Sequence, residues 1–278
     1  MRVLVAGCGY VGIALGERLA AGGCEVFGLR RRVEGLPAAI RPIAADLGDP
    51  ATLRGLPHDL ALVFYTAGAE RGDEPAYRRA YVEGVRNLQG ALGAQRGIRR
   101  LLFVSSTAVY AQSAGEWVDE ASETSPREFR GRILLEGEGL VLASPFPATV
   151  LRLGGIYGPS RTRLLDELRA GRARFVPGRF TNRIHRDDAA GALDHLAQLS
   201  AAEHVILGVD CDPAEERVVF EWLAQRLGAP PPRAAESAPS GRRVGSKRCR
   251  NTRLLATGYR FRHPTFREGY GALLAGGT

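Results

Sequence analysis

A glycine-rich segment near the N-terminus has the spacing of a phosphate-binding turn. The segment GCGYVG follows the short apolar run at 2–6, and apolar residues then recur in roughly helical register. Such a turn lets the backbone approach a pyrophosphate, and the following helix offers free N–H groups to the phosphates. The sequence therefore predicts a dinucleotide site, with a glycine-rich turn that binds nothing as the alternative. The residues expected in the site are Gly7, Gly9, Tyr10, Val11 and Gly12.

The second apolar segment, 25–29, ends in three arginines and not in a carboxylate. Sites that prefer NAD(H) place Asp or Glu there to accept a hydrogen bond from the ribose 2′-hydroxyl. A guanidinium can instead pair with a 2′-phosphate, so Arg30 and Arg31 favour NADP(H), with NAD(H) as the second choice. Solvated surface charge is the alternative. Asp46 is a candidate to bind the adenine amino group, although an aspartate that only caps its own loop would look the same.

Strand-like and helical segments alternate through the first half of the chain. Strands separated by helices of ten or more residues favour right-handed crossovers and a parallel sheet covered on both faces. The sequence thus predicts an α/β fold, a Rossmann-type doubly wound parallel sheet. The strands are expected at 2–6, 25–29, 40–44, 61–68, 101–106 and 148–153, and the longer helices at 75–95 and 126–142.

The regular alternation of strand-like and helical segments ends at about residue 155, and short helices then alternate with loops rich in glycine, proline and arginine. We expect an NAD(P)-binding Rossmann domain over 1–155. A smaller C-terminal substrate lobe over 156–278 is expected to be interwoven with it. Its main helices are predicted at 188–199 and 215–227, with Asp188 as the N-cap of the first.

Four separated motifs, in the right order, resemble the extended short-chain dehydrogenase/reductase superfamily, and within it the atypical members of the NAD-dependent epimerase/dehydratase group. The likeness spans nearly the whole chain. The motifs are VAGCGYVG at 5–12, LLFVSSTAVY at 101–110, RLGGIYGPSR at 152–161 and NRIHRDDAAGAL at 182–193.

The resemblance implies further positions in the cofactor and catalytic sites. Thr66, Ala67 and Gly68 would line the cofactor after the fourth strand, and Gly155 would lie near the nicotinamide. Ser106 would supply the hydroxyl that bonds the reacting oxygen. From the residues alone, a serine at the carboxyl end of a parallel strand faces the crevice where ligands bind, although it could merely cap the strand.

The main catalytic device of this superfamily, Tyr-x-x-x-Lys, is absent. Alignment places Arg130 at the tyrosine and Leu134 at the lysine, and the only lysine in the chain is Lys247. Three hypotheses follow. The chain is a reductase or epimerase with another acid, or it only clamps an anionic substrate group through arginines, or it binds NADP(H) as a sensor or regulatory protein without turnover.

Several residues are candidates for the missing roles. Histidine titrates near neutrality, so His185 could act as acid or base, although a loop histidine bonded to the backbone is an equal alternative. The candidate acids are Tyr110, Tyr157 and His185, and the candidate substrate contacts are Arg130, Arg161, Asn182 and Arg183. The substrate class implied by the resemblance is a nucleotide-activated sugar, and the short lobe favours a smaller hydroxyl or carbonyl compound.

The net charge of +8 is spread as arginines along the whole chain, so we expect no nucleic-acid partner. No apolar run is long enough to span a membrane and no signal peptide is recognisable, so we expect a cytoplasmic protein with a small-molecule substrate. The four scattered cysteines predict neither a metal site nor disulfides. A homodimer is possible through the helices at 75–95 and 126–142.

Overall fold

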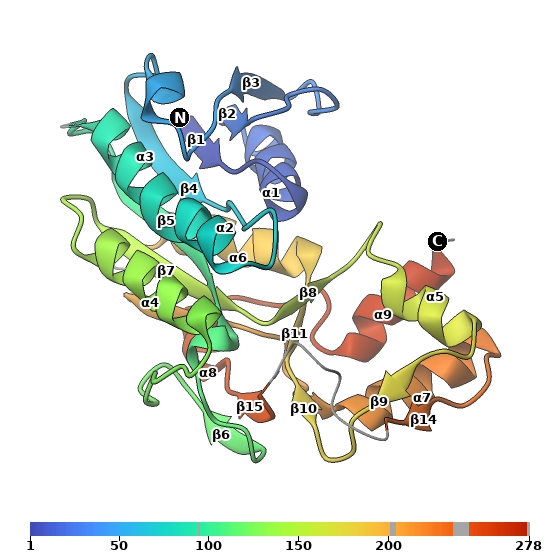
Figure 1. Cartoon of the computed structure of the whole chain (residues 1–278). Helices are drawn as coiled ribbons and strands as arrows, with labels where there is room; N and C mark the ends of the chain where they lie inside the picture. The colour runs from blue at the N-terminus through green and yellow to red at the C-terminus, as the bar shows by residue number, and fades with distance from the viewer. Residues whose placement is uncertain (94, 201–203, 236–244, 277–278) are drawn as a thin grey trace. The chain divides into compact units, whose positions relative to one another are not determined.

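The computed structural model describes residues 1–93, 95–200, 204–235 and 245–276. Its central element is a seven-stranded sheet in the order β12-β7-β5-β4-β1-β2-β3 (Figure 1). The strand order reverses between β1 and β4, which is the switch point where open α/β sheets bind ligands. The predicted Rossmann-type sheet is confirmed. Its strands are β1 (Arg2–Ala6), β2 (Glu25–Arg30), β3 (Ile40–Ala44), β4 (Leu60–Tyr65), β5 (Arg100–Ser106), β7 (Ala148–Leu153) and β12 (Val205–Gly208).

Helices cover both faces of this sheet, because alternate side chains of a strand point to opposite faces. Leu4 and Ala6 of β1 join the apolar cluster that includes side chains of α3 and α4. Val5 instead lies against Gly12 of α1, on the other face. The pairing of Arg18 with Asp194 places α6 on the same side as α1. The helices are α1 (Tyr10–Ala21), α2 (Glu74–Arg78), α3 (Gly84–Leu92), α4 (Phe129–Leu142) and α6 (Arg186–Gln198).

The helix expected at 75–95 forms, but a π-helical turn over Arg79–Glu83 divides it into α2 and α3. The buried hydroxyl of Tyr65 donates a hydrogen bond to the carbonyl oxygen of Ala80 within this turn. A side chain that bonds a helix carbonyl from outside competes with the regular ladder, and π turns occur at such places. The helix ends at Leu92, before Gly93 with a φ of +54°.

The chain divides into two compact units, and the backbone passes from one unit to the other several times. The first comprises Met1–Val109, Ser125–Arg152 and Ala189–Ile206, and the second comprises Tyr110–Thr124, Leu153–Asp188 and Leu207–Thr278. The boundary expected after residue 155 therefore lies close to one of several crossings. None of the helices in the described ranges combines the length and apolar character that a bilayer span requires.

The second unit is built from short paired strands and helices around its own apolar core, which includes Leu165, Val219 and Phe266. The strand pairs are β8 (Gly155–Tyr157) with β11 (Arg183–His185), β6 (Glu116–Val118) with β15 (Lys247–Cys249), β10 (Phe180–Thr181) with β13 (Ala214–Glu215), and β9 (Arg174–Phe175) with β14 (Arg233–Ala234). Its helices are α5 (Arg163–Arg169), α7 (Glu216–Leu227), α8 (Thr252–Ala256) and α9 (Phe266–Ala275).

A buried ion pair fixes α4 against the sheet of the first unit. The Arg152 guanidinium on β7 donates to both carboxylate oxygens of Glu138 on α4, at 3.0 and 2.7 Å. The Ser105 hydroxyl on β5 donates to the same carboxylate at 2.6 Å. All three residues are at least nine-tenths buried, so the charges are shielded from water and depend on each other.

We expect Arg152→Met to lower the free energy of unfolding by about 3–5 kcal/mol, because Glu138 would keep a buried charge with only one remaining partner. Urea denaturation followed by circular dichroism measures this change. Glu136→Gln is the matched control, since Glu136 lies on the same helix but forms exposed pairs, and its loss should cost about 1 kcal/mol or less. Equal effects of the two substitutions would contradict the structural role of the buried pair.

Candidate functional site

The glycine-rich turn joins β1 to α1 at the switch point of the sheet. Gly7 has a φ of +83°, and a Cβ there would overlap the backbone of Ala67, so only glycine fits. The N–H groups of Gly7 and Cys8 donate to the carbonyl oxygen of Leu29 at 2.9 Å, which fixes the turn on β2. Among the described residues no side chain at the Gly9 N-cap accepts a hydrogen bond from α1, and the start of a helix is a place that favours an anion.

The residues that follow β4 pack against this turn. The Thr66 hydroxyl donates to the carbonyl oxygen of Gly7 at 3.0 Å, and a Cβ at Gly12 would lie 2.8 Å from that hydroxyl oxygen. Ala67 covers Gly7, and Gly68 follows it. The structure thus brings together the N-terminal motif and the segment that the resemblance implied, with Tyr10 and Val11 in the first turn of α1.

Arg30 and Arg31 differ in their surroundings at the end of β2. The Arg30 guanidinium is half-buried and reaches the carbonyl oxygen of Cys8 at 3.4 Å, so it lies beside the glycine-rich turn. Arg31 is exposed and pairs with Glu70 at 2.8 Å. A 2′-phosphate at this position would therefore meet Arg30 directly, whereas Arg31 would first have to leave Glu70.

Asp46 supports its own loop. One carboxylate oxygen accepts the Gly48 N–H at 2.8 Å and the other accepts Arg79 at 2.9 Å. Partial burial alone would raise the pKa of Asp46, but the Gly48 N–H and Arg79 outweigh it and lower the pKa below its usual range. Both oxygens are engaged, as expected for the loop-capping alternative, and binding of the adenine amino group stays a prediction.

Of the superfamily's catalytic positions in the first unit, the serine position is kept, and the tyrosine and lysine positions carry other residue types. Ser106 is the last residue of β5, and its hydroxyl oxygen accepts the Ala108 N–H at 3.2 Å, which leaves the hydroxyl proton to donate elsewhere. On α4, Arg130 donates to the carbonyl oxygen of Gly72 and lies over the Phe129 ring. Leu134 is buried. Neither aligned position carries a group that can exchange a proton at neutral pH.

Tyr157 and His185 come together in the second unit, because β8 and β11 pair in register at these residues. Their rings meet edge to face with centroids 5.3 Å apart, and Tyr157 stacks on Tyr270 at 4.3 Å. The Tyr157 hydroxyl has no hydrogen-bond partner among the described residues, and burial raises its pKa. A high pKa keeps this phenol protonated, so it can donate a hydrogen bond but is a poor base.

His185 is a neutral imidazole in this setting. Burial and then the neighbouring His263 lower the pKa of His185 to about 4. Its Nδ1 accepts the Asp187 N–H at 3.2 Å, so Nε2 carries the ring proton. The expectation of a histidine that titrates near neutrality is therefore corrected: at pH 7 it offers an N–H donor and not an imidazolium.

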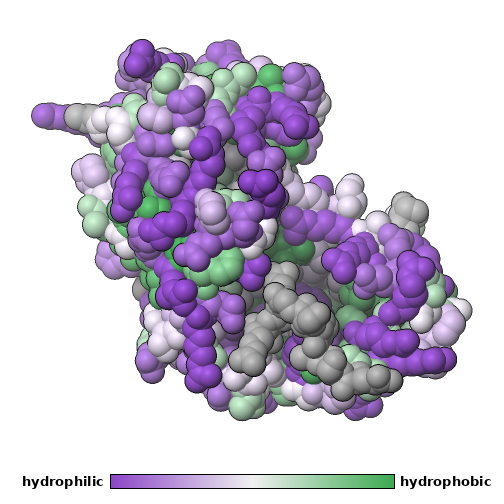
Figure 2. Space-filling view, in the orientation of Figure 1, coloured by the Kyte–Doolittle hydropathy of each residue, from purple (hydrophilic) through white to green (hydrophobic). Residues whose placement is uncertain are grey.

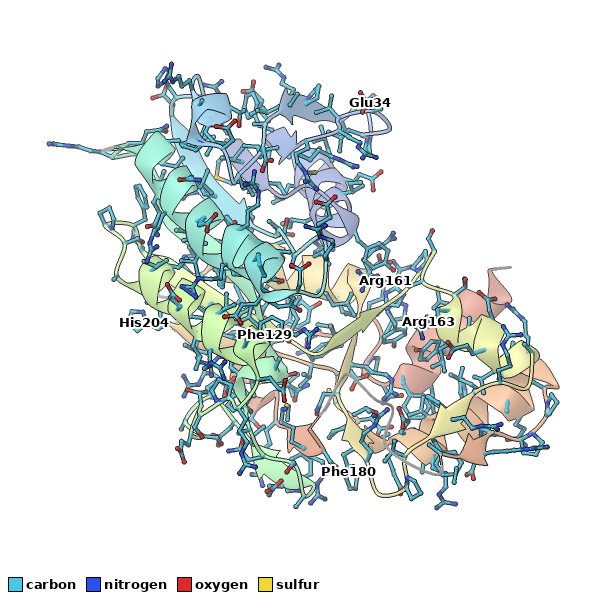
Figure 3. All side chains as sticks on the ribbon, in the orientation of Figure 1. Glu34, Phe129, Arg161, Arg163, Phe180 and His204 are labelled. Carbon is cyan, nitrogen blue, oxygen red and sulfur yellow. The ribbon has the colours of Figure 1, made fainter. Side chains whose placement is uncertain are left out.

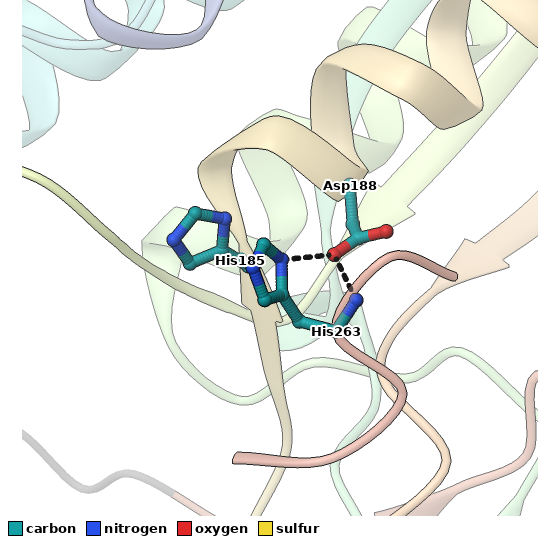
Figure 4. A group of neighbouring side chains, drawn as sticks. All are labelled: His185, Asp188 and His263. Atoms are coloured by element: carbon teal, nitrogen blue, oxygen red, sulfur yellow. Dashed lines mark hydrogen bonds and ion pairs between the residues drawn. The ribbon is translucent and has the colours of Figure 1, made fainter. Parts of the chain in front are cut away.

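The structure adds an Asp188–His263 pair that sequence reasoning missed (Figure 4). One oxygen of Asp188 accepts the backbone N–H and Nδ1–H of His263, and the other accepts the Arg262 N–H and the Tyr259 hydroxyl. The predicted N-cap role of Asp188 is wrong, because α6 begins two residues earlier, at Arg186. No sequence signal links residues 75 positions apart.

His185, Asp188 and His263 are close enough to suggest a metal site. Most of their lone pairs are already used, however: the Asp188 carboxylate accepts four hydrogen bonds, and His185 Nδ1 accepts one. A bound cation would have to break several of these bonds in a buried place. The arrangement is better suited to orienting the His263 ring, whose centroid lies 4.0 Å from that of His185.

Asp210 is a second group that the sequence did not single out. It follows β12, is 1 % exposed, and one of its carboxylate oxygens has no hydrogen-bond partner among the described residues. The other oxygen accepts the Asp212 N–H at 3.2 Å. Burial raises the pKa of Asp210 to about 8, so the group is mainly protonated at neutral pH.

The remaining predicted residues also lie in the second unit. Asn182 uses both ends of its amide on the backbone of β15, and the carbonyl oxygen of Tyr110 accepts a hydrogen bond from Lys247. Arg183 is buried and donates to the Thr181 hydroxyl at 2.6 Å. The Gly155 N–H donates to the carbonyl oxygen of Asn182 at 2.9 Å.

Arg161 lies at an open groove of about 630 Å³ in the second unit, beside the start of α5, where Arg163 is labelled nearby (Figure 3). Hydrophilic side chains cover the visible surface of this region (Figure 2). Arg161 also donates to the carbonyl oxygen of Ile156 at 2.8 Å. The groove is lined by Ser160, Arg161, Thr162, Arg163, Asp166, Glu167 and Arg172.

The fold and the glycine-rich turn define a dinucleotide-binding α/β protein. The NAD-dependent epimerase/dehydratase family model matches residues 3–205, and the chain belongs to this family. The resemblance stated from the motifs is thereby confirmed.

Three related proteins show the range of this family. The 3-diazoavenalumate denitrifying reductase of Streptomyces sp is 30 % identical over 98 % of this chain and 99 % of its own. The structure of an epimerase/dehydratase-family protein from Methylobacillus flagellatus is 36 % identical with a TM-score of 0.83, and covers 99 % of this chain and 98 % of the other. MoeE5, solved with UDP-glucose and NAD, is 25 % identical with a TM-score of 0.81 over 98 % and 96 % of the two chains.

The buried acid Asp210 makes stability depend on pH. Between the ordinary aspartate pKa of about 3.9 and about 8, the unfolded chain ionises while the folded protein keeps the proton, so the free energy of unfolding falls as pH rises. Asp210→Asn mimics the protonated acid. We expect its stability relative to the natural protein to rise across this window, by up to about 1.4 kcal/mol per pH unit.

Denaturation curves at pH 4, 6 and 8 test this expectation. Asp166→Asn is the control, because Asp166 is exposed on α5 and pairs with Arg169 at 3.3 Å. A constant difference between Asp210→Asn and the natural protein at all three pH values would show that Asp210 ionises normally.

Proposed function

We propose that the protein is an NADP(H)-dependent oxidoreductase that acts on a small hydroxyl or carbonyl compound. The observation that carries the cofactor choice is Arg30, which lies beside the glycine-rich turn at the end of β2, where sites selective for NAD(H) have a carboxylate. A half-buried guanidinium near the pyrophosphate turn suits the 2′-phosphate of NADP(H), because charge-assisted bonds to phosphate are strong in partly desolvated sites.

The Thr66–Gly68 segment supports the same proposal. It packs on the turn opposite β2, so a dinucleotide on the turn would meet backbone and small side chains there and no bulky group. Gly7 and Gly12 admit the close approach of β4 and its following loop. The chain's own residues therefore bind and orient the cofactor, which when bound supplies the hydride.

The substrate is proposed to carry an anionic group. The groove beside α5 has three arginines, Arg161, Arg163 and Arg172, against two carboxylates. An open, net positive groove attracts phosphate or carboxylate groups. Two similar proteins support this substrate class: the reductase of Streptomyces sp is named for 3-diazoavenalumate, and MoeE5 was solved with UDP-glucose, and both of these small molecules are anionic.

Two residues of α4 favour a second function, which is cofactor binding without turnover. Where the superfamily has tyrosine and lysine, this chain has Arg130, which donates to the carbonyl oxygen of Gly72, and the buried Leu134. Neither side chain can donate a proton at neutral pH in place of the usual tyrosine. Retained NADPH binding without NADPH oxidation, in the presence of a broad panel of aldehydes and ketones, would favour this function.

We expect the natural protein to bind NADPH more tightly than NADH, and Arg30→Ala to weaken NADPH binding by about tenfold or more, because one charge-assisted pair is lost. NADH affinity should change by less than about twofold, since NADH has no 2′-phosphate. Fluorescence titration of both nucleotides measures these affinities. Arg31→Ala should have the smaller effect, because Arg31 already pairs with Glu70.

Arg54→Ala is the matched control, since Arg54 is exposed and lies in the loop before β4. Equal losses for NADPH and NADH in Arg30→Ala would overturn the assignment of Arg30. A natural protein that binds neither nucleotide would overturn the proposed function as a whole.

A further inference from the structure

The carboxyl ends of β2 and β4 flank the glycine-rich turn in the first unit. β1 lies between these two strands (Figure 1), and its last residue, Ala6, is in register with Leu29 of β2 and Tyr65 of β4. Because the three strands are parallel, the chain leaves β2 and β4 at the same edge of the sheet as the turn. Arg30 on one side and Ala67 on the other already contact the turn.

An ion pair joins the two segments that leave β2 and β4. Arg31, directly after β2, donates to the carboxylate of Glu70, in the segment after β4, at 2.8 Å. The two side chains are 53 % and 62 % exposed, so a ligand at this edge can reach both of them. The hydrogen bond and the charge of Arg31 lower the pKa of Glu70 below its usual range, so this carboxylate is an anion at neutral pH.

Glu70 balances positive charge in these segments. Arg71 and Arg32 add to the lowering of its pKa by their charge, after the larger effect of Arg31. Arg71 also has a carboxylate partner in Asp73, at 3.4 Å. The Glu70 carboxylate therefore acts on Arg31 as a bound anion would.

The ion pair brings a carboxylate to a place where the local sequence has none. Sites that prefer NAD(H) have Asp or Glu at the end of β2 to accept the ribose 2′-hydroxyl, and this chain has arginines there. Glu70 is 39 positions from Arg31 and comes to the end of β2 by pairing with it. A guanidinium that suits a phosphate and a carboxylate that suits a hydroxyl thus lie together on one side of the turn.

A carboxylate and a phosphate bind a guanidinium in the same way, through oxygens that accept its N–H groups. A Glu70 oxygen on Arg31 therefore occupies the kind of place that an oxygen of a 2′-phosphate would take. In NADP(H) such an oxygen is separated from the ribose O2′ by one phosphorus atom, so a carboxylate oxygen in its place is within hydrogen-bonding distance of a 2′-hydroxyl. An ionised carboxylate has about four lone-pair sites, which is enough to hold the hydroxyl and Arg31 together.

Resting on the proposed function, we propose that Glu70 takes the place of the 2′-phosphate when the protein binds NAD(H). With NADH, Glu70 stays on Arg31 and accepts the ribose 2′-hydroxyl. With NADPH, the 2′-phosphate displaces Glu70 from Arg31, while Arg30 contributes the guanidinium that has no carboxylate to leave. Glu70 is thus a specificity-determining residue that admits the second cofactor and limits the preference for the first.

Glu70→Gln tests this role, because it keeps the size of the side chain and removes its charge. We expect NADPH to bind about two- to fivefold more tightly, since Arg31 no longer has to leave an exposed ion pair. NADH should bind about two- to fivefold more weakly, because a neutral amide oxygen is a weaker acceptor for the 2′-hydroxyl than a carboxylate. Fluorescence titration measures both affinities, and competition by 2′,5′-ADP and 5′-ADP confines the effect to the adenosine end.

Changes in opposite directions are the signature of this role. Loss of a negative charge by itself would favour both nucleotides, because both are anionic. Glu17→Gln is the matched control, since Glu17 is exposed on α1 and its substitution makes the same change in net charge. The proposal is overturned if Glu70→Gln shifts the two affinities in the same direction or by no more than Glu17→Gln does. A natural protein that binds NADPH but not NADH overturns it as well.

A double-mutant cycle tests the coupling between Glu70 and Arg31. Arg31→Ala should weaken NADPH binding more in the Glu70→Gln background than in the natural protein, because only in that background is Arg31 free of its carboxylate partner before the nucleotide binds. Both side chains are exposed, so the variants are expected to fold, and circular dichroism checks this. Equal effects of Arg31→Ala in the two backgrounds contradict the proposal.

The same titrations distinguish this proposal from the proposed function. A natural protein that binds neither nucleotide refutes the proposed function itself. A protein whose NADPH affinity depends on Arg30, but whose Glu70→Gln variant lacks the opposite changes, refutes only the role of Glu70.

Discussion

The buried pair of Glu138 and Arg152 fixes α4 against the sheet of the first unit. It joins α4 to β7, and Ser105 connects the same carboxylate to β5 next to Ser106. Because a buried charge without its partner is strongly destabilising, the helix must keep its position whatever residues occupy its other turns. The pair therefore holds α4 against the sheet although this helix carries Arg130 and Leu134 where the superfamily has tyrosine and lysine.

The second unit contains buried ionisable groups whose pKa values are shifted. His185 is kept neutral and Asp210 protonated by the same cause, which is that burial disfavours the charged form. The buried Asp188 carboxylate accepts four hydrogen bonds, which compensate for its removal from water. Lys247 has fewer partners: its amine donates to the carbonyl oxygen of Tyr110 at 3.0 Å.

The regular parts of the fold were predictable from local patterns. Continuous apolar runs marked the strands, since strands buried on both faces need apolar side chains throughout, and the observed burial of β1, β4 and β7 agrees. The π turn at Arg79–Glu83 was not predictable, because the Tyr65 hydroxyl that bonds it comes from another strand. The start of α6 was misplaced by two residues, since Asp188 has a capping residue type but bonds a distant loop.

The sequence by itself determined the family, the sheet and the glycine-rich turn, because these depend on residues that are close together in the chain: Gly7 must be glycine where β1 turns into α1. The tertiary structure decided which side chains are left to do chemistry. His185, Asp210 and Lys247 acquire their buried surroundings from segments tens of residues away, and burial, which shifts the pKa of each, exists only once these segments pack together.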